Sequence, residues 1–227
     1  MRTGVLFRSN RLDVGLEDVE ALGDLGVRLI IDLREQWEAE AHPDAEVDGA
    51  VWQMRTVPGI PLELMKTLAS AEETDAAMRE HYRGFVADPP KREGVAAALH
   101  AVVDGLSEGV IPQVFHCSAG KDRTGWVAAM IQHAVGVRWE DVVADYMLTN
   151  QRTERSRAAA IAAIERRLGP ERAEALAPAW LCERDQLEEA RSEADRCYGG
   201  IDGYLAEGLG VGPREIEVLR ERLVLTR

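Results

Sequence analysis

Apolar residues recur along the chain at two spacings, which predict two kinds of element. Residues 16–25 place leucine and valine at helical intervals, and Gly26 follows as a helix-ending residue. Continuous apolar runs at 27–32 and 111–116 are typical of buried parallel strands, and 50–57 is a weaker run of the same kind. The pattern therefore predicts short strands separated by helices.

Helical patterning accounts for most of the remaining sequence. The expected helices lie at residues 62–87, 95–106, 126–135, 139–148 and over most of 151–227. Because helices are many and strands few, we expect an α/β fold with a small, mostly parallel central sheet wrapped by helices. The 227 residues suffice for a single domain over 1–227, with 151–227 as its helical C-terminal part. Residues 60–90 would form either a helical lid or ordinary packing.

Composition and charge narrow the possible partners. The net charge of −13 argues against a nucleic-acid partner and against stable anchoring on anionic membranes. No window reaches the length and apolarity of a membrane span, and no signal peptide is visible, so a cytoplasmic location is expected, with leaderless secretion left open. Three irregularly spaced cysteines predict neither a disulfide framework nor a zinc site. Cys182 and Cys197 would be packing residues, or either could protect Cys117 as a disulfide partner.

The richest chemistry lies in residues 114–125, where an apolar run ends in Cys117 and Arg123 follows after five intervening residues. A tight loop at a helix N-terminus points backbone N–H groups into one concavity and adds the positive end of the helix dipole. The same field would lower the pKa of Cys117 and make it a thiolate nucleophile. Arg123 can offer a planar fork to two phosphoryl oxygens.

The other loop residues have roles in the same scheme. Gly120 permits a turn or close approach that a Cβ would obstruct. The hydroxyl of Thr124, near which the helix would open, is expected to donate to the sulfur as it leaves. His116 is expected to orient the loop through its ring nitrogens. The expected phosphate-binding residues are Ser118, Ala119, Gly120, Lys121, Asp122 and Arg123.

The loop sequence His-Cys-Ser-Ala-Gly-Lys-Asp-Arg-Thr-Gly resembles that of the atypical bacterial tyrosine and lipid phosphatases. The resemblance implies a protein-tyrosine-phosphatase-like fold and extends over most of the chain, most weakly over residues 40–90. The family usually begins with an Asn-Phe-Arg-Asp-x-Gly-Gly segment, which this chain starts too late to contain. The other matching segments are 6–9, 25–34 with Glu38, 136–150 and 198–205, followed by Leu219-Arg220.

Two residues compete as the proton donor for the leaving oxygen. The resemblance implies the loop residue Asp122, which would move with the bound phosphate. Asp88 is the alternative, because it lies in a Pro-flanked turn at about the separation from Cys117 that ordinary tyrosine phosphatases use. Asp32 follows a predicted strand, and we expect it to brace Arg123 or Lys121 or to assist proton transfer, with Arg34 nearby.

These features predict a cysteine-dependent phosphatase that acts through a cysteinyl-phosphate, with inorganic phosphate as product. The loop supplies the positive charge, so neither a metal nor another cofactor is expected. Protein phosphotyrosine is the first substrate class. Because Lys121 adds a cation at the expected loop rim, a phosphoinositide or dual-specificity activity is the alternative. A non-catalytic phosphate-binding module and rhodanese-like or arsenate-reductase-like chemistry are remoter alternatives.

Overall fold

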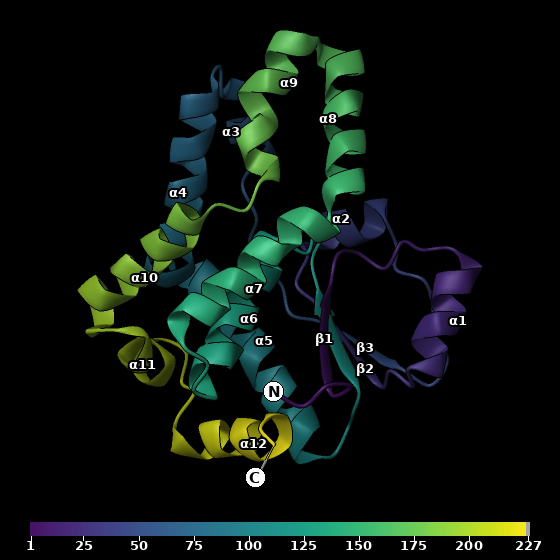
Figure 1. Cartoon of the computed structure of the whole chain (residues 1–227), viewed down its shortest axis with the longest axis vertical. Coiled ribbons are helices and arrows are strands. Elements are labelled where there is room, and N and C mark those ends of the chain that lie inside the picture. The colour runs from purple at the N-terminus through teal and green to yellow at the C-terminus, as the bar shows by residue number, and fades with distance from the viewer. Residues whose placement is uncertain (226–227) are drawn as a thin grey trace.

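The computed structural model describes residues 1–225, which form helices around a small parallel sheet (Figure 1). The sheet has the strand order β1-β4-β2-β3, with every neighbouring pair parallel. This confirms the predicted α/β class and the central parallel sheet. The strands are β1 (Leu6–Ser9), β2 (Leu29–Asp32), β3 (Val51–Met54) and β4 (Gln113–His116).

The two central strands are the ones that the apolar runs predicted. Every residue of β2 and β4 is buried, as expected for strands covered on both faces. In the register, His116 at the end of β4 pairs with both Asp32 and Ser9. The carboxyl ends of β1, β2 and β4 therefore meet at one edge, where parallel sheets place their sites.

Helices lie in each predicted helical segment, but the helix at residues 36–41 was not predicted and several boundaries differ. The helix expected over 95–106 begins at Pro89, because proline fits the first turn, where its missing N–H has no intrahelical partner. The helix behind the loop begins at Asp122 rather than near Thr124. The first helices are α1 (Leu16–Asp24), α2 (Gln36–Ala41), α3 (Leu62–Thr67), α4 (Ala71–Ala87), α5 (Pro89–Ser107) and α6 (Asp122–Ala134). The remaining ones are α7 (Trp139–Arg152), α8 (Glu154–Leu168), α9 (Pro170–Leu176), η1 (Ala177–Trp180), α10 (Arg184–Tyr198), α11 (Ile201–Gly203), the π-helical turn η2 (Tyr204–Gly208) and α12 (Pro213–Leu223).

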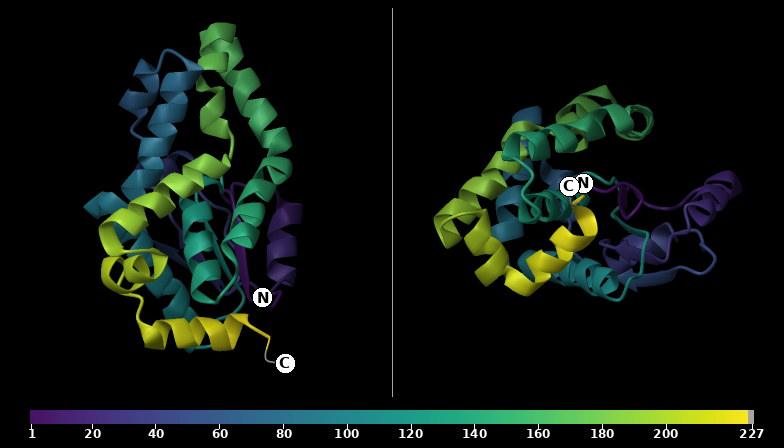
Figure 2. Two further views of the ribbon diagram at one scale, coloured as in Figure 1. Left: turned by 60° about the vertical axis from the view of Figure 1, so that its left-hand side comes forward. Right: turned by 60° about the horizontal axis from the view of Figure 1, so that its bottom comes forward.

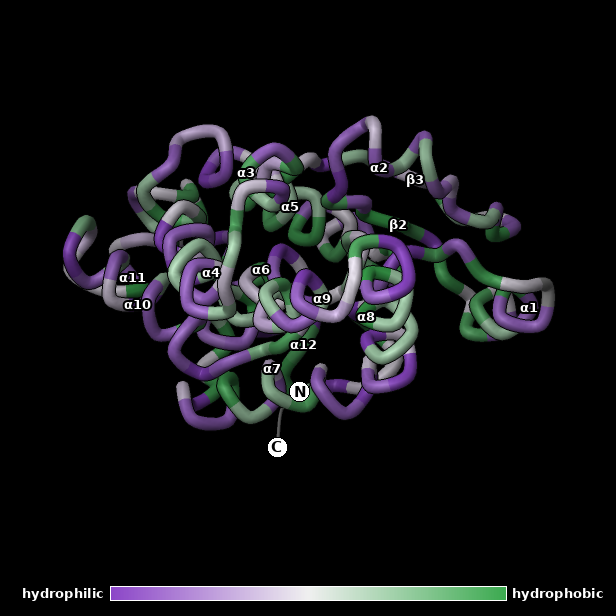
Figure 3. The backbone as a smooth tube through the Cα atoms, turned by 90° about the horizontal axis from the view of Figure 1, so that it is seen from above, coloured by the Kyte–Doolittle hydropathy of each residue, from purple (hydrophilic) through white to green (hydrophobic). Residues whose placement is uncertain are grey.

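Two apolar cores lie on the two faces of the sheet. The larger contains Ile31 and Phe115 from the strands and joins them to helices α4, α5, α6, α7, α10 and α12. The smaller consists of Leu12, Val27, Ile30, Val47 and Val114, with Leu22 of α1 against it. Hydrophobic colour accordingly runs through β2 in the interior of Figure 3, whereas many outward turns are polar. The N-terminus is tied to the last helix, because the Arg2 N–H donates to the Leu223 carbonyl (Figure 2).

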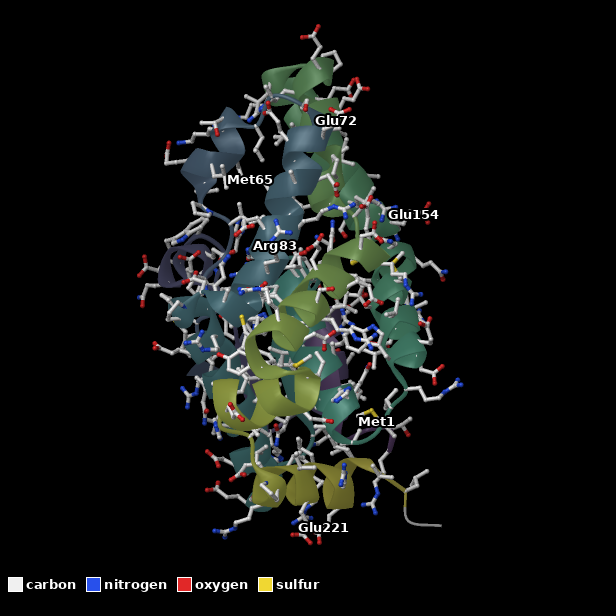
Figure 4. All side chains as sticks on the ribbon, turned by 90° about the vertical axis from the view of Figure 1, so that its left-hand side faces the viewer. Met1, Met65, Glu72, Arg83, Glu154 and Glu221 are labelled. Atoms are coloured by element: carbon white, nitrogen blue, oxygen red, sulfur yellow. The ribbon has the colours of Figure 1, made fainter. Side chains whose placement is uncertain are left out.

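Helices α8 and α9 pack against each other as a hairpin that projects from the body, with α9 also against α4. Helix α4 packs along α10, where Arg83, labelled in Figure 4, forms an ion pair with Glu189. Seven residues of α4 are buried, whereas α3 has none, so ordinary packing accounts for the second half of the 60–90 segment. A lid over residues 60–90 stays a prediction. None of the helices within residues 1–225 combines the length and apolarity that a membrane crossing requires.

Candidate active site

The loop 117–121 connects the end of β4 to the first turn of α6. Cys117 is buried, and Asp122 and Arg123 occupy the first turn of the helix. Gly120 has a φ of 68°, and a Cβ there would lie 2.7 Å from both the Asn10 nitrogen and the Ser9 oxygen. The turn expected at Gly120 is therefore both left-handed and too close to β1 for a side chain.

A carboxylate on α2 holds the arginine of the loop. Arg123 donates from Nη1 to Glu38 Oε2 at 2.6 Å and from Nη2 to Glu38 Oε1 at 2.8 Å. The Ser118 hydroxyl donates to the same Oε1 at 2.6 Å, so Glu38 ties both ends of the loop to α2. Burial raises the pKa of Glu38, but the hydrogen bonds and charge of Arg123 outweigh it and leave the pKa at about 2.

The pKa of Arg123 shows which negative charges surround it. Burial alone would lower this pKa, but the hydrogen bonds to Glu38 and the negative charges of Cys117, Glu38 and Asp122 raise it above its ordinary value. The guanidinium is thus permanently charged and faces the thiol. A phosphoryl group at Cys117 would meet this fixed cation and the N-terminus of α6 together.

Asp122 is held by two neighbours that reach the same oxygen. Lys121 donates from Nζ to Asp122 Oδ1, and the Tyr82 hydroxyl donates to that atom at 2.9 Å. Burial raises the pKa of Asp122, but the positive charge of Lys121 and these hydrogen bonds outweigh it, so the net pKa is below its usual value. In the free protein Asp122 is therefore a carboxylate, with a side chain 20% exposed.

Lys121 does not extend outward as the sequence suggested. Its side chain is only 4% exposed, and Nζ also donates to the Leu181 carbonyl at 3.2 Å. The expectation of a second cation at the loop rim is therefore wrong, because Asp122 and the backbone at Leu181 draw the ammonium inward.

Arg8 braces the back of the loop. Its Nη2 donates to the Gly120 carbonyl at 3.1 Å and to Thr149 Oγ1 at 2.9 Å, and its Nη1 donates to Asp145 at 3.0 Å. One guanidinium thus joins β1, the loop and α7. The fork geometry suits this task, because its donors diverge in one plane.

A second charged cluster lies beneath the loop. Arg34 binds both oxygens of Asp32, and its Nη2 lies 2.7 Å from Asp44 Oδ2. His116 Nε2 lies 3.0 Å from Asp44 Oδ2 and 3.9 Å from Asp32 Oδ1. The contact expected from Asp32 to Arg123 or Lys121 is not found within residues 1–225, because Arg34 takes both carboxylate oxygens.

The same cluster is the one group of potential metal ligands found within residues 1–225: Asp32, Asp44 and His116. The guanidinium of Arg34 lies 2.7 Å from an oxygen of each carboxylate. It therefore already supplies the positive charge between them, and this donor set does not fit a cation. The pKa of Asp44 is lowered, because its contact with His116 and the charges of His116 and Arg34 outweigh the opposing effect of burial.

The other predicted site residues occupy distinct places. The Thr124 hydroxyl is buried and makes no hydrogen bond within the described chain, so its expected role at the sulfur stays a prediction. Asp88 lies at the junction of α4 and α5, where its carbonyl accepts the Arg92 N–H and its charge acts on Lys91. Cys117, Cys182 and Cys197 are all free thiols, and Cys182 lies in the loop before α10 rather than in a helix.

Comparison with known proteins agrees with this geometry. The profile described as "Tyrosine phosphatase family" matches residues 1–225. The chain belongs to the tyrosine phosphatase family. It is 32% identical to the triple specificity protein phosphatase PtpB of Mycobacterium tuberculosis, over 97% of this chain and 91% of that protein. It is 30% identical to a putative tyrosine-protein phosphatase of Cupriavidus necator, over 93% of this chain and 76% of that one. A tyrosine-protein phosphatase of Nostoc commune is 28% identical over 91% of this chain and 69% of its own.

Several residues around the loop of this phosphatase were not assigned a role from the sequence. Glu38 and Tyr146 appeared only inside matching segments, and Tyr82 lies in the predicted helical segment 62–87 without an assigned role. Asp44 lies in an irregular segment with no pattern at all. The sequence offered one indication for Glu38, a carboxylate near the start of a helix that follows a strand. It offered none for the contacts of the Tyr82 and Tyr146 hydroxyls.

Proposed function

We propose that this phosphatase hydrolyses phosphomonoesters through a cysteinyl-phosphate, with protein phosphotyrosine as its principal substrate. The observation that carries the proposal is the Arg123 fork, fixed by Glu38 at the start of α6 beside Cys117. This arrangement joins a nucleophile to a permanent cation aimed at the same place. Preorganised charge of this kind stabilises the transition state without reorganisation during the reaction.

The first step transfers the phosphoryl group to sulfur. The Cys117 thiolate attacks phosphorus, the bond from phosphorus to the ester oxygen breaks, and Asp122 gives its proton to the departing oxygen. Arg123 and the loop N–H groups hold the equatorial oxygens. In the second step water attacks phosphorus, Asp122 takes its proton, and the sulfur leaves with Thr124 as hydrogen-bond donor. The products are the alcohol or phenol and inorganic phosphate.

The negative charge of the substrate can favour the protonated form of Asp122. In the free protein Lys121 and Tyr82 favour the Asp122 carboxylate. A phosphoryl dianion bound next to this carboxylate would add a like charge and raise its pKa. Asp122 is then protonated when substrate is present, so the proposal requires no permanently protonated acid.

The surroundings of Arg123 favour an aromatic ester. Gly59 approaches the guanidinium so closely that a Cβ there would lie 3.8 Å from Arg123 Cζ. The same segment lines an open cavity of about 390 Å³, whose apolar walls are Trp37, Pro58, Ile60, Pro61 and Leu62. Such a rim suits the ring of phosphotyrosine or a neighbouring apolar side chain. The phosphoinositide or dual-specificity alternative is supported by the name of the PtpB relative, which is called triple specificity.

The deciding experiment measures phosphate release without added metal. Wild type and Cys117→Ser are compared on a phosphotyrosine peptide, a phosphoserine peptide and a panel of phosphoinositides. Separate assays test sulfur transfer from thiosulfate and reduction of arsenate. We expect release that is fastest from phosphotyrosine and absent in the serine variant. Equal activity of both proteins would refute the thiol mechanism. Folded wild type that releases no phosphate would favour the binding-module or sulfur and arsenate alternatives.

A further inference from the structure

Three buried polar side chains extend the contacts of Asp122 away from the loop. Tyr82 on α4 donates to Asp122 Oδ1 at 2.9 Å, and its hydroxyl lies 2.5 Å from that of Tyr146 on α7. The Tyr146 hydroxyl lies 3.0 Å from the amide oxygen Oε1 of Gln186 on α10. The three side chains thus form a continuous path from α10 to the catalytic loop. All three residues are almost completely buried.

The donor count fixes the direction of this chain. A phenol has a single proton, and Tyr82 uses its proton on Asp122. The short contact between the phenols therefore needs the proton of Tyr146. The Gln186 atom that lies 3.0 Å from Tyr146 is the amide oxygen Oε1, which also accepts the Glu183 N–H and has no proton to give. The bonds from Tyr146 to Tyr82 and from Tyr82 to Asp122 therefore both point toward the carboxylate, and Gln186 ends the path.

Asp122 is surrounded by cations, and Tyr82 is its neutral hydrogen-bond donor. Lys121 and Arg123 face the carboxylate from the loop and α6, and Cys182 approaches from the segment before α10. His81 lies on α4 next to Tyr82, and burial with the nearby charge of Lys91 lowers its pKa to about 3, so it is neutral. Burial and the negative charge of Asp122 raise the pKa of Tyr82 far above its ordinary value, so the phenol keeps its proton.

We propose that Tyr82 is a positioning residue of the reaction, which fixes Asp122 through Oδ1 and leaves Oδ2 to meet the leaving oxygen, with Tyr146 polarising it. This role rests on the proposed phosphatase mechanism and assigns it a further residue outside the loop. Because both Tyr82 and Lys121 reach Oδ1, the carboxyl group cannot rotate freely about its axis. The donation also stabilises the carboxylate, so it sets the pH at which the acid loses its proton.

The test compares Tyr82→Phe with Tyr204→Phe. Tyr204 is an equally buried phenol that donates to the Phe85 carbonyl of α4, at 2.7 Å, and is therefore a matched control for lost core polarity. The measurement is the pH dependence of kcat/KM, which reports the first step alone, on phenyl phosphate, whose leaving group needs a proton, and on 2,4-dinitrophenyl phosphate, whose leaving group does not. In Tyr82→Phe, kcat/KM on phenyl phosphate should fall severalfold, and the limb where activity is lost at high pH should move up by about one pH unit. The kcat/KM on the dinitrophenyl ester and the profile of Tyr204→Phe should be unchanged.

Two further measurements separate this inference from a structural effect. Tyr82→Phe could misfold because it leaves the Tyr146 hydroxyl unpaired. The double variant Tyr82→Phe/Tyr146→Phe removes both hydroxyls and should show the same shift of the high-pH limb. The carboxyl ¹³C resonance of Asp122, assigned by its loss in Asp122→Asn, should titrate at higher pH in the phenylalanine variant, a readout that needs no turnover. If the wild type is active but Tyr82→Phe shows the same high-pH limb and the same Asp122 titration as the wild type, the role of Tyr82 is overturned. Absence of wild-type turnover would instead refute the phosphatase mechanism, and the carboxyl titration would still report on the phenol.

Discussion

Arg123 and Glu38 are joined by two hydrogen bonds of 2.6 and 2.8 Å between residues 85 positions apart. The fork of the guanidinium therefore has a fixed plane before any substrate arrives. Either charge of this pair would be costly to bury without the other. The Ser118 hydroxyl and the Glu35 N–H also donate to the Glu38 carboxylate. The loop is in this way preorganised by α2.

Replacement of this carboxylate should reduce catalysis. In Glu38→Gln, the neutral amide loses the paired charge and at least one of the two bonds. We expect kcat/KM to fall roughly tenfold to a hundredfold. The matched control is Glu40→Gln on the same helix, an exposed residue whose side chain accepts a hydrogen bond from Gln36. Steady-state kinetics on a phosphotyrosine peptide would test this, and wild-type kcat/KM in Glu38→Gln would contradict it.

The Glu38 carboxylate should make the unfolding free energy depend on pH. The pKa of Glu38 is about 2 in the folded chain, against 4.5 for a glutamate free of such contacts, as in the unfolded chain. Because the folded pKa is depressed, its stabilisation is complete above 4.5 and is lost as pH falls through 2; it amounts to about 3 kcal/mol. Urea unfolding of wild type and Glu38→Gln from pH 6 to 2 would measure it. Parallel pH dependences of the two proteins would count against the assignment.

The brace at Arg8 should require the guanidinium shape. In Arg8→Lys a single ammonium cannot span Asp145, Thr149 and the Gly120 carbonyl together, so the loop would loosen. We expect weaker inhibition by inorganic phosphate and a loss of about 1–2 kcal/mol in unfolding free energy. Arg11→Lys is the control, since Arg11 makes a longer, exposed ion pair with Asp13. Unaltered phosphate affinity in Arg8→Lys would show that the brace is dispensable.

The turn at Gly120 should not tolerate alanine. Its positive φ and the backbone atoms 2.7 Å from the Cβ position both oppose a side chain. We expect Gly120→Ala to lose about 3 kcal/mol or more of stability and most of its activity. Gly136→Ala separates the two causes, because Gly136 has a φ of 88° with no atom near its Cβ position. Equal thermal destabilisation of the two variants would mean that the close approach to β1 has no cost.

The sequence predicted the parts of the fold in which a local pattern has a physical cause. Strands β2 and β4 lie in short apolar runs because both faces are covered, and the spacing of Cys117 and Arg123 follows from the loop that joins them. Strand β1 has no such pattern, since its four residues are half-buried and include Arg8 and Ser9. Its place beside β4 could not be read from periodicity.

The missed site residues depend on contacts between distant segments. Helical spacing predicted the helix that carries Tyr82, but spacing does not reveal what a buried hydroxyl touches. Its partner Tyr146 lies 64 positions away. Asp44 reaches His116 from a segment without regular structure, so neither periodicity nor motif indicates it. Lys121 was placed at the rim for the same reason, because its inward partner at Leu181 is 60 positions away.

The path from Gln186 to Asp122 has a consequence for biosynthesis. A chain leaving the ribosome would contain the whole catalytic loop long before Tyr146 and Gln186 are made, since α7 and α10 follow α6 in the sequence. The nucleophile and its arginine could then be present while the neighbours of the acid are still missing. A nascent chain of this kind would hydrolyse its substrate slowly. Full activity would appear only after α10 has been synthesised and has packed against α4.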